Sequence, residues 1–161
     1  MEEKLYFPIF VDISDKKVVV VGGGAIATRR IRALLPFTSN LFVVAPRVTR
    51  EIKHFSEEGQ IHLYRRNYEK TDVEDAYLVV AATNVREVNH RVGQEAKLAG
   101  AYVSVADCKE ECTMLFPGIA LEKRQGLVVG ITASGRNHSL AKTVTEKIKD
   151  ILKNIEKITD K

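Results

Sequence analysis

The chain has 161 residues, a formal net charge of +4 and an ordinary globular composition, with 45% hydrophobic and 29% charged residues. No apolar run approaches the roughly 18 residues that a membrane-spanning helix needs, and the first ten residues, MEEKLYFPIF, lack the pattern of a signal peptide. With neither a membrane span nor a signal peptide expected, we expect a cytoplasmic enzyme or sensor. The positive charge alone suits an acidic small molecule as well as nucleic acid, but few aromatic residues lie among the basic ones, so we expect no base-stacking surface and no nucleic-acid partner.

Short apolar runs alternate with helical patterns along the first two thirds of the chain, which is typical of a parallel sheet covered by helices. The expected strands are nearly continuously apolar, as strands buried on both faces are. They cover residues 17–21, 41–45, 61–64, 77–82 and 101–105. Helices are expected between them over residues 25–35, 49–58 and 85–99, ended by Pro36, Gly59 and Gly100.

The pattern changes after Asp107. Residues 116–134 are typical of two strands joined by a tight charged turn, and a last helix is expected over residues 139–158. Apolar residues with spacings of 4, 3, 4 and 3 form a seam along one side of this expected helix. The seam either packs on its own domain or binds a second subunit. The seam consists of Val144, Ile148, Ile151, Ile155 and Ile158.

A glycine-rich turn stands between the first expected strand and the first helix. Residues 22–27, GGGAIA, fit the dinucleotide-binding pattern G-x-G-x-x-A. In this pattern the first glycine allows a tight turn, the second lets a pyrophosphate approach the backbone, and the helix N-terminus attracts the phosphates. We therefore expect Gly22, Gly23 and Gly24 to bind a dinucleotide, a structural turn being the alternative. A valine at position 22 should then block the pyrophosphate.

The end of the second strand lacks the acidic residue that commonly holds the ribose of NAD. Ala45, Pro46 and Arg47 stand there instead. Arg47 either receives the 2′-phosphate of NADP or is simply solvated, so the motif by itself leaves NAD and NADP open.

Polar residues follow two later strands. Thr83 and Asn84 close the fourth strand and should face the cofactor, although both, and Asn84 above all, could also cap the next helix. Asp107 closes the fifth strand, which we expect to be a central strand next to the fourth. A carboxylate there suits acid–base work or substrate binding, and a turn or cap is the alternative.

The two cysteines, Cys108 and Cys112, lie four residues apart. A structural zinc site needs four ligands at paired spacings, and the sequence offers no second pair. We therefore expect reduced thiols and no metal site.

Together these segments resemble the precorrin-2 dehydrogenase family, the NAD-dependent module of siroheme synthases. The resemblance runs from FPIFVDISDKKVVVVGGG through AIATRR, LFVVAP, VVAATNVREVNHRV and VSVAD to the hairpin that ends in GITASG. It covers about residues 6–145. The glycine motif is generic, whereas the whole series, with VVAP where most Rossmann proteins carry an acid, is specific.

The resemblance implies NAD-dependent oxidation of precorrin-2, a reduced and acidic tetrapyrrole, to sirohydrochlorin. It implies that Asp107 is the general base or orients the macrocycle, and that Ala25, Ile26, Pro46 and Arg47 contact NAD. Some relatives also insert iron with the same aspartate, which the sequence leaves undecided. The rival hypothesis is a non-catalytic, dinucleotide-sensing regulatory domain, but such domains usually keep the acid that this chain lacks.

Basic side chains after the hairpin are candidates for binding the substrate's carboxylates, namely Arg136, His138 and Lys142. The alternative is that they are solvated residues at a helix start, and the family commonly has a small pair of residues at this point.

The expected architecture is a Rossmann-like doubly wound parallel sheet followed by a β-hairpin and a C-terminal helix. We expect an NAD-binding domain over residues 1–112 and a helical dimerisation segment, with its hairpin, over residues 113–161. A homodimer is the expected assembly.

Overall fold

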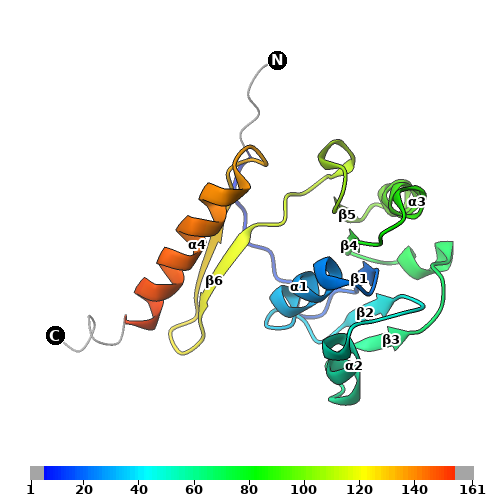
Figure 1. Cartoon of the computed structure of the whole chain (residues 1–161), viewed down its shortest axis with the longest axis horizontal. Coiled ribbons are helices and arrows are strands. Elements are labelled where there is room, and N and C mark those ends of the chain that lie inside the picture. The colour runs from blue at the N-terminus through cyan, green and yellow to red at the C-terminus, as the bar shows by residue number, and fades with distance from the viewer. Residues whose placement is uncertain (1–5, 155–161) are drawn as a thin grey trace. The chain divides into compact units, whose positions relative to one another are not determined.

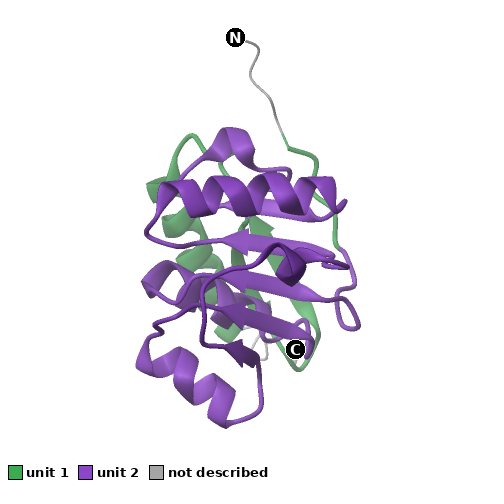
Figure 2. Cartoon of the chain, turned by 90° about the vertical axis from the view of Figure 1, so that its right-hand side faces the viewer, with its two compact units in different colours: residues 1–10, 115–161 green, residues 11–114 purple. Residues whose placement is uncertain are grey.

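The computed structural model of the chain describes residues 6–154. These residues form two compact units, one of residues 11–114 and one that combines residues 6–10 with residues 115–154 (Figure 2). The expected division after residue 112 placed residues 6–10 in the first domain, whereas the structure groups them with the C-terminal unit.

Five parallel strands form the sheet of the first unit, in the order β3-β2-β1-β4-β5. Because β1 pairs with β2 on one side and with β4 on the other, the strand order reverses at β1. In such sheets ligands bind at the carboxyl ends of the strands, near this reversal. The strands are β1 (Val18–Val21), β2 (Leu41–Val44), β3 (His62–Tyr64), β4 (Leu78–Ala81) and β5 (Tyr102–Val105).

Helices cover both faces of this sheet, which confirms the doubly wound fold expected from the sequence. The helices are α1 (Ala25–Leu34), α2 (Arg50–Glu57) and α3 (Arg86–Leu98). In Figure 1, α3 lies on one side of the strands and α1 and α2 on the other. All four valines of β1 are at most 1% exposed, because a central strand of a covered sheet is buried on both faces.

The helix ends follow the local signals. Thr49 caps α2 through a hydrogen bond to its side chain from the Ile52 amide. Gly59 and Gly100 follow α2 and α3 with φ of +69° and +81°, a conformation that ends helices and favours glycine. Between β3 and β4 the connection contains the short helix η1 (Lys70–Val73).

The expectation that Asp107 follows a central strand is wrong, because β5 is an edge strand of the sheet. The chain that follows β5 covers its outer edge. The Thr113 amide donates to the Val103 carbonyl (2.9 Å), and the Val103 amide donates to the Thr113 hydroxyl (2.8 Å). The Cys112 thiol accepts a hydrogen bond from the Val105 amide (3.2 Å). The edge is thereby kept from pairing with another chain.

The second unit consists of the antiparallel strands β6 (Gly118–Glu122) and β7 (Leu127–Ile131) with α4 (His138–Lys153) packed on them. Gly118 lets α4 approach closely, since a Cβ there would overlap with the Thr145 side chain. The hairpin and the last helix were both expected, and Ile155 and Ile158 of the expected seam lie outside the described residues.

Within residues 6–154, no helix combines the length and the apolar character needed to cross a membrane.

Candidate active site

The loop between β1 and α1 is held by backbone packing at its first two glycines. Gly22 has φ of +131°, and a Cβ there would overlap with the Ala82 carbonyl at the end of β4. A Cβ on Gly23 would overlap with the Arg47 carbonyl. A valine at position 22 was expected to block the pyrophosphate, and this reason is wrong. Its side chain would overlap with the Ala82 carbonyl before it could reach a bound cofactor.

The third glycine, Gly24, faces open space. A Cβ added there meets no atom within 4 Å, and Gly24 is the N-cap residue of α1. Within the described part of the chain, no side chain caps this helix and its first turn holds no acidic residue. The free N–H groups and the positive end of the helix dipole suit a pyrophosphate. Ala25 and Ile26 are exposed beside this position, whereas Ala27 is fully buried against the sheet.

The segment after β2 is tied to the glycine loop. The Thr49 amide donates to the Gly23 carbonyl (3.0 Å), and the Thr49 and Thr28 hydroxyls lie 2.9 Å apart. Pro46 and Arg47 are exposed on this segment, beside Gly23. This is where the adenine-side ribose of a dinucleotide lies in Rossmann folds.

At the end of β4, Thr83 contacts a buried asparagine of α3. The Thr83 amide donates to Oδ1 of Asn89 (2.9 Å), and the Thr83 hydroxyl lies 2.8 Å from the same oxygen. The N-cap of α3 is Val85, whose amide donates to the Thr83 hydroxyl (3.1 Å). The alternative reading of Asn84 as the cap is therefore wrong, and Asn84 is exposed.

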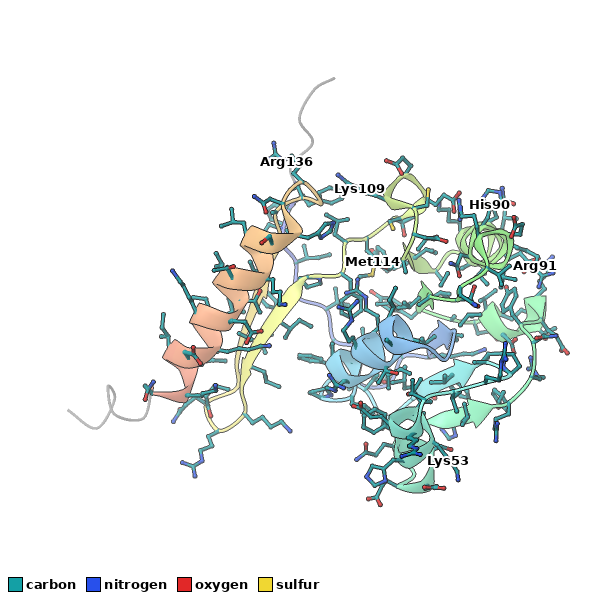
Figure 3. The ribbon with its side chains drawn as sticks, in the orientation of Figure 1. Lys53, His90, Arg91, Lys109, Met114 and Arg136 are labelled. Carbon is teal, nitrogen blue, oxygen red and sulfur yellow. The ribbon has the colours of Figure 1, made fainter. Side chains whose placement is uncertain are left out.

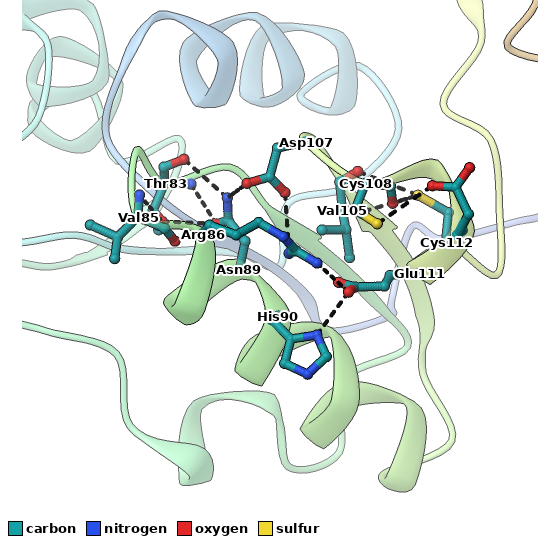
Figure 4. Close-up of polar contacts among 11 residues, drawn as sticks. Thr83, Val85, Arg86, Asn89, His90, Val105, Asp107, Cys108, Glu111 and Cys112 are labelled. Atoms are coloured by element: carbon teal, nitrogen blue, oxygen red, sulfur yellow. Dashed lines mark hydrogen bonds and ion pairs between the residues drawn. The ribbon is translucent and has the colours of Figure 1, made fainter.

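Asp107 lies next to this cluster, since β5 pairs with β4 as expected. Its Oδ2 accepts a hydrogen bond from Nδ2 of Asn89 (2.8 Å), and its Oδ1 lies 3.5 Å from the Arg86 guanidinium. The Asp107 side chain is 38% exposed, so its carboxylate is both held by α3 and accessible. Figure 4 shows these contacts.

Arg86 also binds Glu111, the last residue of the short helix η2 (Lys109–Glu111). Glu111 accepts a second hydrogen bond from Nδ1 of His90 (2.7 Å). The hydrogen bonds from Arg86 and His90 lower the pKa of Glu111 to about 2. Among the described residues, Oε2 of Glu111 is a buried oxygen with no hydrogen-bond partner. Residue-type patterns missed this cluster, and the i, i+4 spacing of Arg86 and His90 on a helix was its one local signal.

Both cysteines are free thiols. Burial raises the pKa of Cys112, whose thiol bonds to β5. Across residues 6–154, no three His, Cys, Asp or Glu side chains are grouped so that they could hold a metal ion.

The basic candidates after the hairpin belong to the other unit. Arg136 lies between β7 and α4 (Figure 3), His138 is the first residue of α4, and Lys142 follows one turn later. All three are exposed. The structure thus brings Thr83, Asn89 and Asp107 together, while a substrate role for the three basic residues stays a prediction.

Known proteins resemble this chain over both units. A family model described as "Putative NAD(P)-binding" matches residues 9–118. The chain is 46% identical over 146 residues to the "Probable multifunctional siroheme biosynthesis protein HemA" of Ruminiclostridium josui, over 90% of this chain and 28% of that protein. It is 33% identical over 147 residues to the "Siroheme synthase" of Photorhabdus laumondii, over 91% of this chain and 31% of that protein.

Among solved structures, "SirC, precorrin-2 dehydrogenase" superposes with a TM-score of 0.78 at 30% identity, over 90% of this chain and 70% of that one. The chain spans about three tenths of the length of the two curated relatives named above. The region matched by the family model contains the glycine loop, Thr83, Asn89 and Asp107.

Proposed function

The chain belongs to the family of precorrin-2 dehydrogenases and siroheme synthases, and from this premise we propose that it oxidises precorrin-2 to sirohydrochlorin with NAD. The observation that carries the proposal is a continuous line of contacts. Gly22 packs on the Ala82–Thr83 backbone, Thr83 bonds to Asn89, and Asn89 bonds to Asp107. A glycine loop suited to a dinucleotide is thus connected to an accessible carboxylate.

The residues of the loop fit a dinucleotide. We assign the pyrophosphate to the open position at Gly24 and the uncapped N-terminus of α1. We assign the adenine-side ribose to Pro46 and Arg47, and the nicotinamide end to Thr83 and Asn84. When bound, NAD supplies the acceptor for one hydride.

Loss of two hydrogens from precorrin-2 also releases a proton, and we assign its acceptance to Asp107. The carboxylate is accessible at the carboxyl end of β5, beside the end of β4. A positioned carboxylate of this kind contributes a rate factor of about 10²–10⁴.

The finer parts of the proposal concern recognition and assembly. Arg136, His138 and Lys142 are proposed to bind the carboxylates of the tetrapyrrole, for which charge-assisted hydrogen bonds are suited. The chain is proposed to form a homodimer through α4. The free thiols Cys108 and Cys112 suit the reducing cytoplasm, which we propose as its compartment.

The activity is tested with the purified chain, precorrin-2 and either NAD or NADP, while the absorption of sirohydrochlorin is followed. We expect turnover with NAD. Asp107→Ala should lower turnover by about 10²–10⁴-fold with unchanged NAD affinity. His138→Ala should remain active, because His138 is assigned to binding the substrate and not to accepting its proton.

Three outcomes would contradict the proposal. NAD binding without any turnover of precorrin-2 would favour the dinucleotide-sensing alternative. An active Asp107→Ala variant beside an inactive His138→Ala variant would move the base to the other unit. Tighter binding of NADP, with the preference lost in Arg47→Ala, would overturn the choice of NAD.

A further inference from the structure

Asn89 is a fully buried polar side chain that lies between the ends of β4 and β5. Its relative exposure is 0%. It makes contacts to both strand ends: its Oδ1 accepts from the Thr83 amide (2.9 Å), and its Nδ2 lies 3.1 Å from the Thr83 carbonyl and 2.8 Å from Oδ2 of Asp107. A buried amide costs free energy unless such partners are present.

The orientation of this amide is determined by the Thr83 backbone. A backbone N–H can only donate, so the oxygen of the Asn89 side chain must face it, and a backbone carbonyl can only accept, so the nitrogen must face that. One hydrogen of Nδ2 then serves Thr83 and the other serves Asp107. Asn89 is therefore an obligate donor to Asp107.

We propose that Asn89 is a positioning residue, which fixes the Asp107 carboxylate relative to the cofactor-facing end of β4 and makes Oδ1 the proton-accepting atom. The inference rests on the proposed function. Oδ2 accepts the hydrogen bond from Asn89, whereas Oδ1 has, among the described residues, the longer ion-pair contact of 3.5 Å to the Arg86 guanidinium, so we assign the substrate proton to Oδ1.

An amide donor suits a carboxyl group that changes its protonation state. After Oδ1 takes a proton, Oδ2 is the carbonyl oxygen of a neutral carboxyl and still accepts the same hydrogen bond from Nδ2. The side chain therefore keeps one orientation before and after proton transfer. The other charged or titratable groups around Asp107 are Arg86 and His90 on α3, and Cys108 and Glu111 after β5.

Two variants of Asn89 separate positioning from packing. Asn89→Leu keeps the branching and the number of heavy atoms of the side chain but removes its donor and its acceptor, and we expect kcat to fall on the order of 10²-fold, since a small misplacement of a reacting group costs that much. Asn89→Asp keeps an acceptor for the Thr83 amide but sets two carboxylates against each other. One of such a pair retains its proton to higher pH, so the acid limb of the kcat–pH profile should move to higher pH.

Tyr68→Phe is the matched control. The Tyr68 hydroxyl donates to Glu95 on the same helix α3 (2.6 Å) and does not touch Asp107. Its loss removes a hydrogen bond that anchors α3, so it should lower the melting temperature and leave the kcat–pH profile unchanged.

A second measurement does not depend on turnover. In the chain without ligands, the side-chain amide resonance of Asn89 in ¹⁵N NMR should shift in Asp107→Ala, because this substitution removes the acceptor of its hydrogen bond. An Asn89 resonance that is unchanged in Asp107→Ala would overturn the hydrogen bond to Asp107. A wild-type chain that turns over precorrin-2 beside Asn89 variants with unaltered kcat and pH profile would overturn the positioning role. A wild-type chain without turnover would instead contradict the proposed function.

Discussion

At the scale of single residues, the three glycines of the loop differ in what surrounds them. Gly22 and Gly23 face backbone carbonyls, whereas Gly24 faces open space at the start of α1. A side chain at position 22 would therefore overlap with the protein backbone, whereas a side chain at position 24 would enter the open space in which a ligand could bind. The loop can be tested for folding and for binding separately.

We predict that Gly24→Val abolishes measurable NAD binding with little change in stability, because its side chain enters only the space assigned to the pyrophosphate. Gly22→Ala should lower the free energy of unfolding by on the order of 3 kcal/mol, through its positive φ and its overlap with β4. Calorimetric titration and thermal unfolding measure the two effects. Retained NAD affinity in a folded Gly24→Val variant would mean that the pyrophosphate lies elsewhere.

At the scale of elements, Glu111 joins η2 to α3. Its carboxylate binds Arg86 and His90, and these hydrogen bonds lower its pKa from an ordinary value of 4.5 to about 2 in the folded chain. A carboxylate whose folded pKa lies below its unfolded pKa stabilises the fold above the unfolded value. The stabilisation is lost as the pH falls from about 4.5 towards 2.

We predict that Glu111→Gln lowers the melting temperature at pH 7 and that its difference from the wild type shrinks as the pH falls through this window. Glutamine keeps the size and one acceptor but not the charge. Thermal unfolding of both proteins from pH 7 to pH 2 measures the effect, and Glu110→Gln on the exposed side of η2 is the control. A difference in melting temperature that stays constant at every pH would show that the charge of Glu111 does not contribute to its contacts with Arg86 and His90.

At the scale of the whole molecule, α4 leaves apolar side chains exposed. Leu140, Val144 and Ile151 are 54%, 36% and 53% exposed within the single chain. They repeat along one side of the helix, as residues that meet a partner helix do. A second copy of the chain is the occupant that the proposed homodimer assigns to this surface.

We predict that Val144→Glu combined with Ile151→Glu converts a dimer into a folded monomer, because buried charges in an apolar interface are costly. Thr143→Glu with Lys147→Glu adds the same residues at exposed polar positions of α4 and should leave the dimer intact. Light scattering at micromolar concentration gives the mass of each. A monomeric wild type, or a dimer that survives the first pair of substitutions, would count against this interface.

Several features were determined by the sequence itself, because they depend on residues that are neighbours in the chain. Four consecutive valines predict a strand buried on both faces, and a small-residue turn after them predicts the loop at Gly24. Gly100 predicts the end of α3, and the order of the elements predicts that Asp107 lies next to β4. These predictions are confirmed in the structure.

The tertiary structure alone decided the surroundings of those residues. An asparagine within a helical pattern is typical of an exposed position, yet Asn89 is buried because β4 and β5 end on either side of it. The edge position of β5 and the covering of its edge by Cys112 and Thr113 depend on which strands pair, and the period of the apolar residues does not encode pairing order. Burial and hydrogen bonding between segments arise only once the sheet is assembled, so the line of contacts from Thr83 to Asp107 could not be predicted from local patterns.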